Sequence, residues 1–136
     1  MAARSTRIIR NGCGYVYQIP CEDKVWLEEF LYKNQTAIHL LLDCSAGTSY
    51  ENFSHSLIEL ETAINELSIS ECMQFQIKQS MDADFIHIIS CCFINSVLSI
   101  PLRQHTNGRQ QYLRILGDYF SFYGAGWKHL LNKAIP

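Results

Sequence analysis

The sequence predicts a single α+β domain over residues 1–136, with helices packed mainly on one face of a mixed β-sheet. Three observations support this prediction: two β-prone runs around an Asn-Gly dipeptide, a continuous apolar run of strand length, and a long segment with helical periodicity. The expected sheet consists of an N-terminal hairpin and two or three further strands. A three-layer α/β arrangement is the alternative.

The composition is that of a globular protein with a sizeable core, because 48% of the residues are apolar and 18% are charged. The N-terminus shows no secretory signal, so we expect a cytoplasmic protein with six reduced cysteines. The segment from Phe85 to Leu102 carries no formal charge and reaches the lower limit of a membrane span, about 18 residues. It holds His87, Asn95 and several serines, so we expect a core segment and no membrane span.

The first thirty-four residues predict a hairpin followed by a helix. The β-prone runs Thr6–Arg10 and Cys13–Ile19 flank Asn11-Gly12, the dipeptide that best supports a type I′ turn. Glu22–Asn34 carries apolar residues at helical spacing and acidic residues in its first turn, where the helix dipole favours them. We therefore expect a short amphipathic helix after the hairpin.

The middle of the chain predicts two strands and a helix between them. Thr36–Asp43 (TAIHLLLD) is a continuous apolar run, which favours an interior strand. Thr48 and Glu51 form the Thr-x-x-Glu pattern of a capping box, and apolar residues then recur at steps of three and four, which predicts a helix over 49–67. Cys72–Gln79 alternates apolar and polar residues, so it is expected to be a half-exposed strand near the sheet edge.

The segment 85–100 is open to two interpretations. Its β-branched and aromatic content favours a strand at Phe85–Ser90, whereas its length suits a buried helix. We expect a strand first and a helix after it. Beyond Asn107-Gly108, a further amphipathic helix is expected to end near Gly124 and Gly126.

The last of these helices also carries the candidate binding surface. Its aromatic residues offer more area than one helix face can bury, and aromatic patches beside basic residues are typical of protein interfaces. The candidate binding residues are Tyr119, Phe120, Phe122, Tyr123, Trp127, Arg109 and Arg114. The alternative is that these rings close the core over the sheet.

The charges are unevenly distributed along the chain. Residues 1–20 hold three arginines and no acid, residues 21–84 hold twelve acids against three lysines, and residues 103–136 hold five basic residues against one acid. Such asymmetry either steers a partner of opposite charge or lets the basic ends fold over the acidic middle, and we favour the second interpretation.

A loop around Cys44 carries the sharpest chemical signal. It lies between the expected strand and the helix over 49–67, where backbone N–H groups bind anions and activate a thiol. The tetrapeptide Cys44-Ser45-Ala46-Gly47 resembles the active loop of protein tyrosine phosphatases and the phosphocysteine loop of the small IIB components of the sugar phosphotransferase system. The resemblance implies phosphoryl transfer at Cys44, with Ser45, Gly47, Thr48 and Ser49 as the anion loop.

The loop departs from both families. The phosphatase loop has an arginine six positions after the cysteine, where this chain has Tyr50, and a histidine before it, where this chain has Asp43. The IIB loop needs no arginine, but its strand opens the domain, whereas the strand expected here begins at Thr36. An acid beside the thiol would also repel phosphate. Cysteine-dependent phosphoryl transfer or anion binding is therefore kept as the alternative function.

The expected order of hairpin, helix, buried strand, helix and strand is similar to the sulfate-transporter and anti-sigma-antagonist family of regulatory domains. That resemblance implies a switch at a phosphorylated serine, but the matching position holds Glu51-Asn52. No Cys-x-x-Cys or His-Glu-x-x-His motif is present, so we expect no metal and no cofactor. Arg103, Arg109 and Arg114 match no nucleic-acid reader motif, and nucleic-acid binding is not expected.

These observations predict a small non-catalytic interaction or regulatory protein that acts through protein–protein contacts and associates with itself. The aromatic C-terminal helix and the strand expected at 72–79 are the surfaces predicted to carry those contacts.

Overall fold

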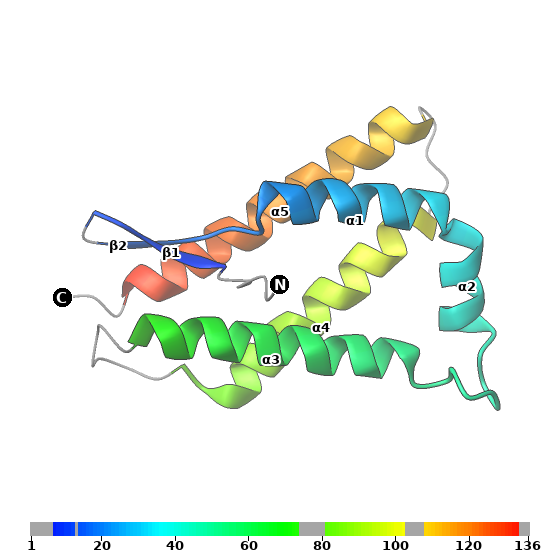
Figure 1. Ribbon diagram of the computed structural model, residues 1–136, viewed down its shortest axis with the longest axis horizontal. Helices are drawn as coiled ribbons and strands as arrows, with labels where there is room; N and C mark the ends of the chain where they lie inside the picture. The colour runs from blue at the N-terminus through cyan, green and yellow to red at the C-terminus, as the bar shows by residue number, and fades with distance from the viewer. Residues whose placement is uncertain (1–6, 13, 74–80, 103–107, 134–136) are drawn as a thin grey trace.

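The fold is mostly helical, with one small β-hairpin (Figure 1). The computed structural model describes residues 7–12, 14–73, 81–102 and 108–133. The elements in chain order are β1 (Ile8–Asn11), β2 (Gly14–Tyr17), α1 (Cys21–Lys33), α2 (Gln35–Asp43), α3 (Phe53–Met73), α4 (Ala83–Ser99), the short 3₁₀ helix η1 (Ile100–Leu102) and α5 (Gly108–Lys133).

The predicted mixed sheet is wrong, and so is the three-layer alternative. Over the described residues the hairpin is the only sheet, and Thr36–Asp43 forms the helix α2 instead of an interior strand. A short apolar run without a clear period fits a strand and a helix equally well, and here the helix forms on the surface. Ile38 is buried whereas Leu40 is 52% exposed. The element order that is similar to the anti-sigma-antagonist family is therefore not present.

The strand predicted at Phe85–Ser90 is also wrong, because that segment belongs to α4. The Asp82 carboxylate caps this helix by accepting a hydrogen bond from the Asp84 N–H at 2.8 Å. Buried side chains then recur at helical spacing, with Ile86, Ser90, Phe93 and Val97 on one face. Packing of this face outweighs the β-branched composition.

The expected strand over 72–79 lies largely outside the described residues. Its first two residues, Cys72 and Met73, end α3, and residues 74–80 are not described. The predicted helix over 49–67 exists but is displaced, because α3 begins at Phe53 and continues to Met73. The predicted C-terminal helix also continues further than expected, since Gly124 and Gly126 lie inside α5.

The hairpin and the first helix were predicted correctly. The two strands pair antiparallel, with Asn11 opposite Gly14, and Gly12 adopts the left-handed conformation with φ of 64° that this tight turn requires. Helix α1 covers nearly the predicted range and carries Glu22 and Asp23 in its first turn. Both segments have local sequence signals, which explains the agreement.

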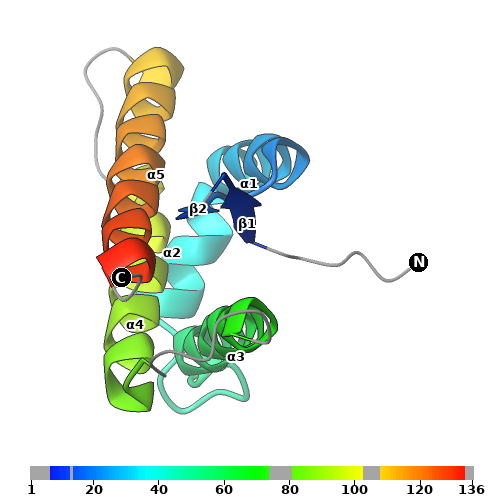
Figure 2. The ribbon, with the colours of Figure 1, turned by 90° about the vertical axis from the view of Figure 1, so that its left-hand side faces the viewer.

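Helix α5 packs against the hairpin, α1 and η1, and its aromatic rings contact Phe93 of α4. In Figure 2, α4 and α5 stack on one side, while α1, the hairpin and α3 lie on the other. Six side chains of α5 face the core at steps of three and four residues: Tyr112, Leu116, Phe120, Tyr123, Trp127 and Leu131. The burial of this apolar stripe removes a large apolar area from water and so stabilises the fold.

A side chain of α5 closes the outer edge of β2. The Asn132 amide oxygen accepts a hydrogen bond from the Tyr15 N–H at 2.7 Å, and the Asn132 amide nitrogen donates to the Tyr15 carbonyl at 2.8 Å. The approach is close enough that a Cβ at position 14 would lie 2.5 Å from the Asn132 oxygen, which explains the glycine there.

No helix among the residues that the structure describes is long and apolar enough to cross a lipid bilayer. The uncharged segment that raised the question of a membrane span forms α4 and η1, and its buried face contributes Phe93, Val97, Leu98 and Ile100 to the core.

The importance of the α5 stripe is testable with two neighbouring residues. Leu116 is fully buried, whereas Ile115 is 37% exposed. We expect Leu116→Ala to lower the free energy of unfolding by about 2–5 kcal/mol, because the substitution leaves a cavity in the core. Ile115→Ala is the matched control and is expected to cost less than about 1 kcal/mol. Urea denaturation measures both, and equal losses would contradict the assignment of the stripe.

Candidate functional site

A cluster of buried polar side chains in the described part of the chain surrounds an ion pair between Arg7 and Glu61. Arg7 immediately precedes β1, and Glu61 lies on the inner face of α3. The Arg7 Nη1 donates to the Glu61 Oε2 and, at 3.1 Å, to the Tyr17 hydroxyl. The side chains of Arg7 and Glu61 are only 12% and 4% exposed. Because the charges are buried together, each depends on the other for compensation.

Further hydrogen bonds extend this ion pair into a network. The Tyr17 hydroxyl donates to the Asn65 Oδ1 at 2.7 Å, and the Asn65 Nδ2 donates to the Ser90 Oγ at 2.9 Å and to the Tyr123 hydroxyl at 3.2 Å. The Ser90 hydroxyl in turn donates to the Ile86 carbonyl at 2.8 Å. The network therefore connects the hairpin to α3, α4 and α5.

The network holds its members in defined ionisation states. Burial raises the pKa of Tyr17 to about 12 and also raises the pKa of Tyr123, which keeps both phenols neutral. Burial alone would lower the pKa of Arg7, but Glu61 and Tyr17 together outweigh burial and the pKa is raised, so the guanidinium stays charged. The groups are bonded to one another and largely buried, so each buried polar group finds a partner within the network.

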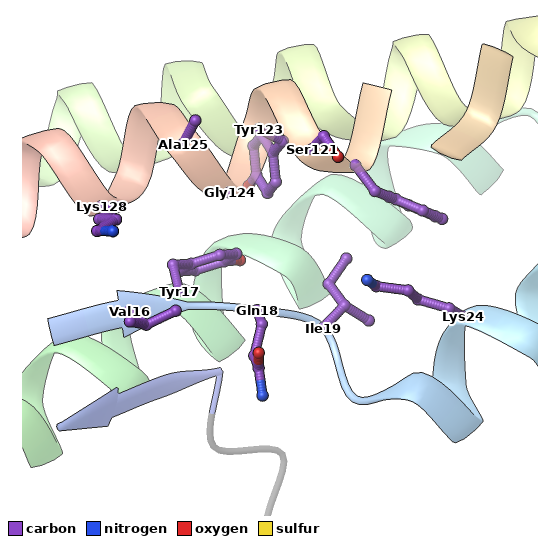
Figure 3. Close-up of a pocket in the computed structure, with 11 residues that line it drawn as sticks. Val16, Tyr17, Gln18, Ile19, Lys24, Ser121, Tyr123, Gly124, Ala125 and Lys128 are labelled. Atoms are coloured by element: carbon purple, nitrogen blue, oxygen red, sulfur yellow. The ribbon is translucent and has the colours of Figure 1, made fainter. Parts of the chain in front are cut away.

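A pocket lies beside the network, between β2, α1 and α5 (Figure 3). Its volume is about 240 Å³. The Tyr17 and Tyr123 rings form part of its wall, while their hydroxyls belong to the network. The Tyr17 ring is held by stacking on Trp127 at a centroid distance of 5.1 Å and by an edge contact with Tyr123 at 5.5 Å. Two lysines, Lys24 and Lys128, also line it.

The outer face of α1 carries an exposed aromatic pair. The rings of Trp26 and Phe30 stack at a centroid distance of 4.9 Å and are 62% and 42% exposed. The opposite face of the helix packs inward, where Leu31 is buried and Leu27 is partly buried. The pair is therefore presented to solvent on a helix anchored from behind.

The structure divides the predicted aromatic surface of α5. The core contains Phe120, Tyr123 and Trp127. This agrees with the alternative interpretation that these rings close the core, except that they pack among helices and a hairpin instead of over a large sheet. Tyr119 is partly buried against Phe93. Phe122 remains on the surface with 76% of its side chain exposed.

The two predicted basic residues lie near the start of α5. Arg109 donates to the Glu29 carboxylate at 2.9 Å and lies over the Tyr32 ring, 5.1 Å from its centroid. It thus connects α5 to α1. Arg114 is exposed one turn further along α5. Arg103 lies outside the described residues.

The loop around Cys44 does not have the geometry on which the anion-loop prediction was based. The premise that a strand leads through Cys44 directly into a helix is wrong, because Cys44 is exposed and caps the C-terminus of α2, with its N–H donating to the Leu40 carbonyl. The C-terminal end of a helix carries partial negative charge, which disfavours an anion.

The loop's own groups also occupy its N–H donors. The Gly47 N–H donates to the Glu51 carboxylate at 2.9 Å, and the Tyr50 N–H donates to the Thr48 hydroxyl oxygen at 3.1 Å. The Ser45 hydroxyl donates to the Leu41 carbonyl, and Ser49 is exposed. Thr48 and Glu51 thus stabilise turns before α3 and do not cap it.

The residues of the buried network were missed from the sequence, although a signal for some of them was present. Glu61 and Asn65 are four residues apart and lie on the same face of α3 as the apolar Leu57 and Ile69. Polar residues at core positions of an amphipathic helix indicate a buried network. Arg7 gave no such signal, because its partner is far away in the sequence.

Comparison with protein-family models, curated proteins and solved structures finds no match to this chain. The assignment of function therefore depends on the geometry of the described residues.

The cost of breaking the buried ion pair is testable. Arg7→Met leaves the Glu61 carboxylate buried without its partner, and we expect a loss of about 3–5 kcal/mol in the free energy of unfolding. Arg10→Met, which removes an exposed arginine from β1, is the matched control and is expected to change little. Adding Glu61→Leu to Arg7→Met is expected to recover part of the loss, as urea denaturation would measure. An Arg7→Met protein as stable as wild type would refute the role of the pair.

The tyrosines of the network predict a fall in stability at alkaline pH. The pKa of Tyr17 is raised from 10.0 to about 12, so the unfolded chain loses this proton first as the pH rises. The contribution is fully present below about pH 10 and is lost as the pH rises through about 12. Tyr17→Phe should be less stable at neutral pH but show a shallower loss between these limits, whereas the exposed Tyr50→Phe should retain the wild-type dependence. The urea midpoint of each protein is measured as a function of pH, and tyrosinate absorbance reports the ionisation of the tyrosines. If wild type and Tyr17→Phe lose stability equally steeply between about pH 10 and pH 12, Tyr17 does not have this role.

Proposed function

We propose that this protein is a non-catalytic interaction protein that acts through protein–protein contacts and associates with a second copy of itself. The observation that carries the proposal is the stacked pair of Trp26 and Phe30 on the outer face of α1. The contact surface is defined here as the α1 face, made of Asp23, Trp26, Phe30 and Lys33.

Aromatic exposure on a firmly anchored helix favours a contact role. Tryptophan is enriched among the residues that dominate binding free energy, and its burial removes a large apolar area from water. The two rings already stack on each other, so little side-chain entropy remains to be lost on binding. Val25, next to the pair, is 53% exposed and adds to the apolar area.

The charges on the α1 face favour a second copy as the partner. Asp23, Trp26, Phe30 and Lys33 follow one another at steps of three and four residues, so they share one side of the helix. If two copies of α1 pack antiparallel about a two-fold axis, the aromatic pairs meet at the centre. Asp23 of each copy then lies opposite Lys33 of the other, so both ends of the contact gain opposite charges.

The closed polar network supports a non-catalytic role. The most concentrated group of titratable and polar side chains is bonded internally and shielded from solvent, as the pair of Arg7 and Glu61 illustrates. The loop at Cys44, on which the alternative of phosphoryl transfer rests, presents a helix C-terminus instead of the helix N-terminus that such chemistry uses.

The proposal is tested by the mass of the protein in solution as a function of concentration. We expect wild type to form a dimer and the double variant Trp26→Ser, Phe30→Ser to raise the dissociation constant by at least about tenfold, because losing a central aromatic contact typically costs about 2 kcal/mol or more. Phe122→Ser removes the more exposed aromatic residue of α5 and is the matched control, which should leave the dimer intact. Analytical ultracentrifugation measures all three.

The charge arrangement has its own test. Lys33→Glu should weaken the dimer, and combining it with Asp23→Lys should restore it, because the exchange preserves the opposite charges across the two-fold axis. A wild-type protein that stays monomeric at all concentrations, or a dimer that dissociates with Phe122→Ser and not with the α1 variants, would overturn the proposal.

A further inference from the structure

The pocket between β2, α1 and α5 combines apolar walls with two positive charges (Figure 3). Of the eleven residues that line it, none is acidic. Lys24 lines the pocket from α1 and Lys128 from α5, so the two basic residues come from different elements, and Figure 3 shows them at opposite ends of the pocket. The charged residues that line the pocket are therefore both positive.

Among the described residues, neither lysine has an ion-pair partner. Across residues 7–12, 14–73, 81–102 and 108–133, the ion pairs involve Arg7, Lys33, His39, His55 and Arg109, and no carboxylate lies within ion-pair distance of Lys24 or Lys128. The Lys24 Nζ instead lies 6.0 Å from the centroid of the Phe120 ring. Figure 3 shows the Lys24 side chain extending from α1 toward α5. Two uncompensated cations beside one cavity favour an anion.

The walls of the pocket favour a ligand that has an apolar part next to its anionic group. Ile19, Phe120 and the ring of Tyr17 contribute apolar surface. The Tyr17 and Tyr123 rings are fixed, because their hydroxyls are bonded into the buried network on the far side. A ligand therefore meets preformed aromatic walls, which lowers the entropy lost on binding.

The volume limits the size of the ligand. About 240 Å³ is space for roughly eight water molecules at about 30 Å³ each, and it is smaller than the usual range for drug-sized ligands. A molecule with one ring and one carboxylate fits this space, whereas a nucleotide does not.

The surface beside the pocket carries further positive charge. A shallow groove continues along α5 and shares Ala125 and Lys128 with the pocket, and it adds the cationic Lys133. Positive charge around an entrance raises the local concentration of anions and speeds their association.

We propose that this pocket binds a small organic anion, a carboxylate on a planar apolar body of about one ring. The proposal goes beyond the contact role of α1, because Lys24 lies on the inner side of that helix while Trp26 and Phe30 lie on the outer side. Each can fail without the other.

Three probes separate the charge from the apolar body. Benzoate carries both, benzamide carries the ring without the charge, and inorganic phosphate carries the charge without the ring. Two-dimensional NMR titration of the wild-type protein is expected to show saturable binding of benzoate, with amide shifts at Gln18, Ser121 and Gly124, and at least tenfold weaker binding of the other two. Binding of all three probes with equal affinity would overturn the proposed selectivity.

The lysines are tested by variants that keep the length of the side chain. Lys24→Met and Lys128→Met are each expected to weaken benzoate binding at least tenfold, whereas Arg114→Met, an exposed base elsewhere on α5, should leave it unchanged. Thermal unfolding of each variant checks that the fold is retained. Saturable binding that survives both lysine substitutions, or no saturable binding of benzoate to wild type, would refute the site.

Discussion

The buried ion pair of Arg7 and Glu61 is the interaction on which the arrangement of the molecule depends. Two opposite charges inside a protein are tolerated only where each is compensated in a fixed geometry, and the surrounding polar groups must be bonded as well. Here that requirement attaches the start of β1 to the middle of α3 and brings Tyr17 and Asn65 into one network. The same bonds fix the ring of Tyr17, which serves as a wall of the neighbouring pocket. The pair thus links the hairpin to α3 and helps to fix one wall of the cavity, while α5 holds the hairpin through Asn132 and Trp127.

The parts of the fold that could be predicted from the sequence are those with a local turn signal or helix-start signal. Gly12 permits the tight hairpin turn, although the register places Asn11 in β1 opposite Gly14, and the acids of the first turn identify α1. The strands predicted at Thr36–Asp43 and Phe85–Ser90 are wrong, because the β-branched and apolar composition of these segments does not decide between strand and helix. In α4 the decisive signals were the cap at Asp82 and the spacing of Ile86, Ser90 and Phe93, which is helical even though the residues favour strands. For α2 the segment is only nine residues long, too short for the helical spacing of Ile38 and Leu42 to decide against a strand.

The candidate sites were less accessible to prediction, for a physical reason. The aromatic residues of α5 were visible in the sequence, but whether a ring faces the core or the solvent depends on which elements pack against the helix. Trp127 and Phe122 are close in sequence, yet the first is 2% exposed and the second 76%. The pocket joins Tyr17 to Lys128 through tertiary contacts alone, so no spacing could reveal it. The aromatic pair on α1 was readable as a helical spacing, but its exposure was not.

The amide of Asn132 has a consequence for how the protein behaves in a crowded solution. An open strand edge is a template to which other extended chains add, and such addition is a common first step toward aggregates. By occupying both backbone groups of Tyr15, the Asn132 side chain takes the place of a third strand and denies β2 to any such addition. This protection comes from the last turn of α5. A protein cleaved before Asn132 would therefore expose the backbone N–H and carbonyl of Tyr15 to other chains. The C-terminal turns of α5 therefore act as a safeguard against sheet growth as well as a part of the core.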